Sequence, residues 1–111
     1  MKNVKQAAFQ GELFFIKVDS LPEDAKEAEG NIVGHSETGH HHVATGANVS
    51  RYTTSDPLTD YIVGKSIQIE HLREFDTHET LNLLNDGEGE VIWKIRRQRE
   101  HTPDGWRRVE D

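Results

Sequence analysis

The ten-residue stretch from Gly34 to Val43 concentrates the side chains of this chain that could do chemistry. It holds four of the seven histidines and one carboxylate, Glu37, in a glycine-flanked segment. Alternate side chains of a β-strand share a face, so His40 and His42 are predicted to project together. Two neutral imidazoles on one face form a chelating pair for a divalent metal ion.

Further candidate ligands lie far along the chain, in Asp76-Thr77-His78. A divalent ion needs at least a third protein ligand, and a β fold that brings the two strand starts together would let His78 supply it. Glu37 or Asp76 would then complete the shell. The predicted ligands are therefore His40, His42 and His78 with Glu37 or Asp76, a set that suits zinc, iron, manganese or nickel without choosing among them.

The remaining histidines are not assigned to the metal. His35 lies in a loop and His41 would face away from the pair, while His71 and His101 lie beside charged residues and indicate structural or solvated positions. Three imidazoles and one carboxylate fill the four-coordinate shell of zinc, which favours a structural role. The same ligands leave coordination positions open on six-coordinate iron or manganese. The sequence therefore does not decide whether the protein is an enzyme.

Composition limits both the ligands and the partners. The chain has no cysteine, which excludes disulfides and thiolate metal sites. Its net charge of −7 divides into −9 over residues 1–93 and +2 over residues 94–111, where six basic side chains face four acidic ones. The acidic body argues against nucleic acid as a partner, and the basic end favours pairing with a second copy. No apolar run reaches the roughly 20 residues of a membrane span, so a soluble intracellular protein is expected.

Short apolar segments separated by turns predict an all-β protein. We expect one β domain over residues 1–111, a small barrel or sandwich of which a cupin-like arrangement is one form, with residues 102–111 as a tail packed on it. Residues 23–30 indicate a solvated connection, and Asn85-Asp86-Gly87 predicts a hairpin turn. The expected strands are residues 10–19, 31–33, 49–54, 61–63, 66–72, 78–83 and 91–96.

The order of several short motifs resembles a group of small uncharacterised proteins of bacteriophages and mobile elements. These motifs include Gln10-Gly11-Glu12, the pattern GHxxTGHxH from Gly34 to His42, and the pattern QRE(Y/H)xP…RxVxD in residues 98–111. The resemblance implies a phage or prophage origin, with a place in the cytoplasm of the bacterial host or in the virion. It implies no established activity.

Two functions are therefore predicted from different classes. The first is a phage-type β protein that binds a divalent metal through its histidine and carboxylate cluster. The alternative is a small acidic interaction protein, either a virion component or an inhibitor of a host factor, whose histidines only shape a surface. Possible partners are a second copy of the chain, a host protein or a virion protein.

Overall fold

The computed structural model describes residues 1–10, 13–33, 41–72, 77–85, 87, 89–97, 99–102 and 105–108. Side chains are described for these residues except 41, 71, 72, 77, 78, 99–102 and 105–108. All regular structure within these ranges is β-strand. This part of the chain contains no helix long and apolar enough to cross a membrane.

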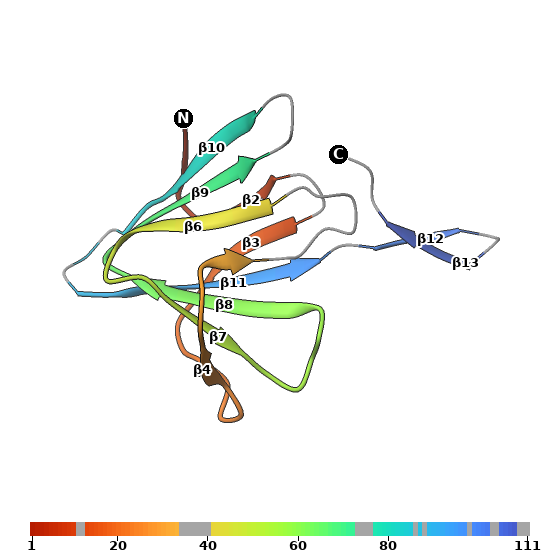
Figure 1. Ribbon diagram of the computed structural model, residues 1–111, viewed down its shortest axis with the longest axis horizontal. Coiled ribbons are helices and arrows are strands. Elements are labelled where there is room, and N and C mark those ends of the chain that lie inside the picture. The colour runs from red at the N-terminus through yellow and green to blue at the C-terminus, as the bar shows by residue number, and fades with distance from the viewer. Residues whose placement is uncertain are drawn as a thin grey trace.

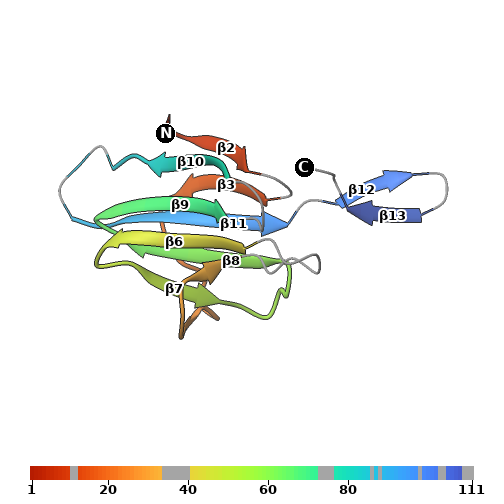
Figure 2. The ribbon, with the colours of Figure 1, turned by 45° about the horizontal axis from the view of Figure 1, so that its top comes forward.

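Two sheets lie face to face and form a β-sandwich (Figures 1 and 2). Sheet A has the order β1-β10-β9-β6-β5, and sheet B has the order β2-β3-β11-β8-β7-β4. Neighbouring strands are antiparallel except β1 and β10, which are parallel. The strands of sheet A are β1 Lys2–Val4, β5 Ile32–Val33, β6 His41–Ala47, β9 Ser66–Leu72 and β10 Thr77–Leu83. Those of sheet B are β2 Ala7–Gln10, β3 Leu13–Val18, β4 Lys26–Ala28, β7 Ser50–Thr53, β8 Thr59–Gly64 and β11 Val91–Arg97.

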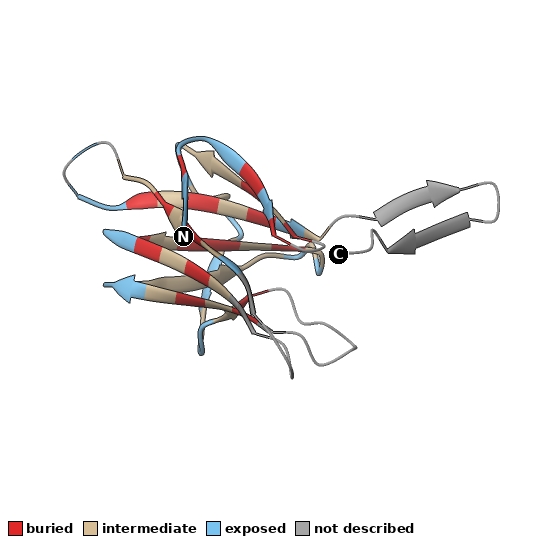
Figure 3. Ribbon diagram, turned by 90° about the horizontal axis from the view of Figure 1, so that it is seen from above, coloured by how far each residue is buried: buried red, intermediate tan, exposed pale blue. Residues whose placement is uncertain are grey.

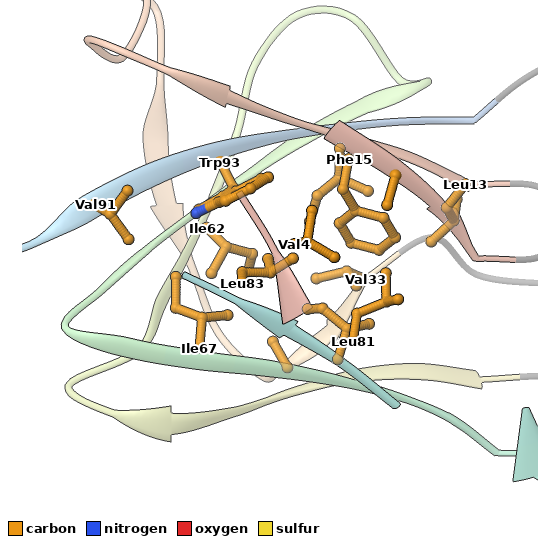
Figure 4. Close-up of a cluster of buried hydrophobic side chains, with 14 residues drawn as sticks. Val4, Leu13, Phe15, Val33, Ile62, Ile67, Leu81, Leu83, Val91 and Trp93 are labelled. Atoms are coloured by element: carbon orange, nitrogen blue, oxygen red, sulfur yellow. The ribbon is translucent and has the colours of Figure 1, made fainter. Parts of the chain in front are cut away.

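The hydrophobic core lies between the sheets and draws equally on both. Figure 3 shows buried positions alternating with more exposed ones along the strands, as the period of two requires. Figure 4 shows Trp93 and Phe15 of sheet B facing Ile67 and Leu81 of sheet A. Each such side chain contributes about 1.5–3 kcal/mol when fully buried. The core contains Val4, Val33, Ala44, Ile67, Ile69, Leu81 and Leu83 from sheet A and Ala8, Leu13, Phe15, Ile62, Val91, Trp93 and Ile95 from sheet B.

The prediction of an all-β fold is confirmed, in its sandwich form. Strand β11 follows its predicted pattern closely, because Val91, Trp93 and Ile95 are buried and the residues between them are not. This strand is central in sheet B, between β3 and β8, so its inward side chains are covered by sheet A from end to end.

Two local predictions were wrong. Residues 23–30 contain the edge strand β4, which pairs with β7 and is not merely a connection. The Asn85 turn forms, since its side chain accepts a hydrogen bond from Gly87 N (3.1 Å) and donates one to Gly89 O (2.7 Å). It does not join a hairpin, because β10 belongs to sheet A and β11 to sheet B. The turn signal was correct, but local sequence does not specify which strands pair.

Beyond β11, strands β12 Arg99–Thr102 and β13 Gly105–Arg108 form a separate two-stranded antiparallel sheet. Figure 1 shows this hairpin past the end of β11. The sequence predicts residues 102–111 only as a tail packed on the domain. The hairpin is an addition to that description, and its packing stays a prediction.

Gly46 is required by a close approach of β6 to β9. Its φ is +135°, and a Cβ at this position would collide with the backbone carbonyl of Ser66. We expect Gly46→Ala to lower the free energy of unfolding by more than about 3 kcal/mol, because main chain must move to make room. Urea unfolding checks this, with Gly87→Ala as the control, since nothing lies within 4 Å of a Cβ there. Equal stability of the two variants would contradict the expectation.

Asp56 braces the start of β8 through its charge. Its carboxylate accepts hydrogen bonds from Leu58 N (2.9 Å) and Thr59 Oγ1 (2.8 Å), which together lower its pKa from the ordinary value. A lowered pKa in the folded state means that this stabilisation is complete above the ordinary pKa and is lost as pH falls through the lowered one.

We therefore expect Asp56→Asn to reduce the free energy of unfolding by about 0.5–1.5 kcal/mol at pH 7. The difference from wild type should shrink as pH falls below about 4. Chemical unfolding at pH 7, 4 and 2.5 checks this, with the exposed Asp19→Asn as a control. A difference in the free energy of unfolding that stays constant from pH 7 to pH 2.5 would contradict a stabilising role for the Asp56 charge.

Candidate functional site

Three histidines occupy one row across three neighbouring strands of sheet A. His42 on β6 pairs with His71 on β9, and His71 pairs in turn with His78 on β10. Directly paired residues of an antiparallel sheet lie on the same face with Cβ atoms about 4.5–5.5 Å apart. We call this set of three positions the histidine row.

The histidine row lies near one end of sheet A. Its described side chain, His42, is buried on the inner face, two residues before the buried Ala44 on β6. Only one further row of paired residues lies beyond it, in which Leu72 pairs with the first residues of β6 and β10. The row is therefore the next-to-last row of paired residues at this end.

A β-bulge places His78 in this row. Leu81 pairs with Ile69, and His78 pairs with His71. Between these two pairs, β10 spans three residues while β9 spans two. Without the extra residue, Glu79 would stand opposite His71. The bulge thus places a histidine, and not Glu79, opposite His71 in the register.

The imidazole of His42 is held in place by a glutamine of the opposite sheet. His42 is 1% exposed, and its Nδ1 lies 2.8 Å from Oε1 of Gln10 on β2. Gln10 is also buried, and its Nε2 donates to the carbonyls of Ile69 (2.9 Å) and Glu79 (3.1 Å). These four residues form a cross-sheet network at the level of the histidine row.

The network determines the tautomer of His42. Because Gln10 Nε2 donates to two carbonyl oxygens, its Oε1 must be the acceptor facing the imidazole. The proton of a neutral imidazole is then on Nδ1, and the lone pair is on Nε2. This is the arrangement of a metal-ligating histidine, whose second nitrogen donates to an oriented oxygen.

Of the predicted ligands, the structure describes His42 completely and His78 by its strand position. Glu37, His40 and Asp76 lie outside the described residues. In the sequence, His40 directly precedes β6 and Asp76 directly precedes β10. Among the side chains that the structure describes, no three histidine, aspartate or glutamate residues form a metal-binding group.

Sequence reasoning missed two residues of this region. His71 was assigned a structural or solvated position because of its charged neighbours, although Ile67, Ile69 and His71 share one parity on β9. That alternation was the available signal. Gln10 carried no comparable signal, since its partners are distant in sequence and one is in a bulge.

A hollow of about 270 Å³ lies at the opposite end of the sandwich. Its lining includes Lys17, Asp19, Asn85 and Glu90, where β3 ends and β11 begins. It contains none of the predicted ligands. The described network of His42 and Gln10 lies at the other end.

These features define a class of protein, a two-sheet β-sandwich with a buried histidine and glutamine network near one end. The chain belongs to the family described as Domain of unknown function (DUF8820), whose sequence profile matches residues 9–98. The match includes Gln10 and all three positions of the histidine row. No curated protein and no solved structure matches the chain. Membership agrees with the resemblance to an uncharacterised group, and the phage origin stays a prediction.

The network allows a test of how much Gln10 contributes to the fold. Gln10→Leu removes the partners of His42 Nδ1 and of two carbonyls while keeping similar bulk. Each buried group left unsatisfied costs about 1–3 kcal/mol, and the bonds to His42 and Ile69 are buried. We therefore expect the free energy of unfolding to fall by at least about 2 kcal/mol. Urea unfolding measures this, with Gln6→Leu as the matched control because Gln6 is exposed. Gln10→Leu as stable as the control would contradict the network.

Proposed function

We propose that this protein binds one divalent metal ion through the histidine row. The proposed ligands are His42, His71 and His78, joined by Glu37, Asp76 or His40 from the adjoining segments. The observation that supports the proposal is the register of β6, β9 and β10, which brings three histidine positions from distant parts of the sequence into one row.

The spacing of the row suits a common ion. Neighbouring strands are about 4.8 Å apart, so the two outer strands are roughly 10 Å apart. Metal–imidazole bonds are about 2.0–2.1 Å long for zinc. An ion above the middle strand is therefore within reach of a histidine on each of the three strands.

The surroundings of His42 favour the same interpretation. Its Nδ1–H is bonded to Gln10, so a metal would bind at Nε2, and Gln10 would act as the outer partner that fixes the ring. Burial of a dication requires nearby negative charge. Glu37 or Asp76 would supply this charge, which is why a carboxylate remains in the proposed set.

The role of the ion depends on its identity. Three imidazoles and one carboxylate close a tetrahedral zinc shell, which would join three strands of sheet A in the manner of a structural site. A six-coordinate iron, manganese or nickel ion would keep positions open. Binding at the histidine row is compatible with a structural ion or with an ion that keeps open positions.

A second candidate, the small interaction protein, is supported by a different observation. Phe9 is 59% exposed on an edge strand, far above what a core residue type normally shows. The phage origin, the host-cytoplasmic or virion location and the homo-oligomer also stay proposals, since they derive from the resemblance and from charge.

Metal content tests the first proposal. We expect wild-type protein purified without a histidine tag to hold about one metal ion per chain. A His71→Asn/His78→Asn variant should hold a small fraction of that, and His101→Ala, outside the row, should hold as much as wild type. Elemental analysis measures each. Equal content in all three, or none in wild type, would overturn the proposal.

Chelation provides a second measurement on the same proteins. A ligand that binds only the folded state stabilises it by about 4 kcal/mol at 1,000 times its Kd. Removing the ion with a chelator should therefore lower the unfolding temperature of wild type and leave the His71→Asn/His78→Asn variant unchanged. If both melt identically before and after chelation, the row serves only as part of a hydrogen-bonded core.

A further inference from the structure

In the described part of the chain, the edge strands of the two sheets are β1, β5, β2 and β4. Strand β2 differs from the other three. Strand β1 carries Lys2, β4 carries Lys26 and Glu27, and β5 has only two residues. Charges and short length protect sheet edges from pairing with other chains. Strand β2 reads Ala-Ala-Phe-Gln, has no charge and is the longest of the four.

The backbone of β2 has two residues directed to the open side. Lys17 N donates to Gln6 O, which sets the pairing phase between β2 and β3. Because hydrogen-bonded and non-hydrogen-bonded pairs alternate, Ala8 and Gln10 bond to β3, whereas Ala7 and Phe9 present their N–H and C=O groups away from it. No partner for these groups is found within the described part of the chain.

The outer face of sheet B beside this edge is apolar. Phe9 stacks on Phe14 with ring centroids 4.8 Å apart and an interplanar angle of 43°. The row that begins with Ala7 continues through Ile16, which is also only half-buried. An antiparallel sheet normally presents polar side chains on its solvent face. Exposed apolar surface next to an uncharged strand edge is typical of a binding surface.

The charges of this surface are basic. Lys5 is exposed and lies just before β2, and residues 1–10 contain no carboxylate. The two rows from β2 reach Lys94 and Arg96 on β11. Asp56 interacts electrostatically with both, and its negative charge offsets part of theirs. On a protein of net charge −7, this is a local excess of positive charge.

We propose that the β2 edge and its outer face bind an acidic segment of another protein, which adds to sheet B as an extra antiparallel strand. Backbone groups of Ala7 and Phe9 would pair with the segment. Its alternate apolar side chains would contact Phe9, and its acidic ones would lie near the lysines. A second copy fits less well, because residues 1–10 offer no carboxylate to the basic groups of a mate.

A synthetic peptide of eight alternating valine and glutamate residues, capped at both ends, is the probe. Its valine and lysine counterpart tests the charge. We expect the acidic peptide to bind, with a Kd that rises with salt, to shift the amide resonances of Ala7 and Phe9, and to slow their hydrogen exchange. The basic peptide should not bind.

Two variants of Ala7 distinguish loss of the backbone contact with the peptide from loss of stability. Ala7→Pro removes an N–H that the β2–β3 ladder does not use, so stability should stay close to wild type while peptide affinity falls about tenfold. Ala7→Gly keeps the N–H and should bind with less than about threefold loss. Phe9→Ser should also weaken binding without a change in metal content, because Phe9 lies outside the histidine row.

Several outcomes would overturn the inference. These are no binding of the acidic peptide, equal binding of both peptides, or unchanged affinity in Ala7→Pro. Binding of an oligothymidylate strand but not of the acidic peptide would assign the surface to nucleic acid. A dimer by light scattering that Ala7→Pro dissociates would assign it to a second copy.

Discussion

The hydrogen bonds of Gln10 tie the two sheets together at the level of the histidine row. Side-chain packing holds the rest of the core, but packing is non-directional and tolerates small shifts of one sheet over the other. Gln10 adds direction, since its amide reaches an imidazole on β6 and two carbonyls, one on β9 and one in the β10 bulge. The positions of three strands relative to β2 are therefore set by a single side chain.

This arrangement accounts for a polar layer inside a small sandwich. Burying His42 and Gln10 is unfavourable unless their polar atoms are bonded, and each bonds to the other. The bulge between His78 and Leu81 contributes by turning the carbonyl of Glu79 into an acceptor for Gln10. An irregularity on one strand thus satisfies a donor from the facing sheet, and the same irregularity brings a third histidine position into the row.

Much of the fold was predictable because it depends on alternation, as in Val91, Trp93 and Ile95 on β11. The pairing of strands was not, since it depends on contacts between distant segments. The Asn85 turn was recognised but joined to the wrong partner for this reason. In the site, the parity of His42 was predictable. The meeting of the two strand starts, which brings His78 near His42, was also predicted. The role of Gln10 and the bulge that sets the register of His78 were not, because neither has a clear mark in composition.

The parallel pairing of β1 with β10 has a consequence for the order in which the strands of sheet A pair. Lys2 pairs with Leu81, so β1 has no neighbour in its sheet until the distant strand β10 is in place. Non-local pairing of this kind slows folding and leaves early strands open to wrong partners. Strand β1 is therefore expected to be among the last strands to pair, although it precedes the other strands of its sheet in sequence.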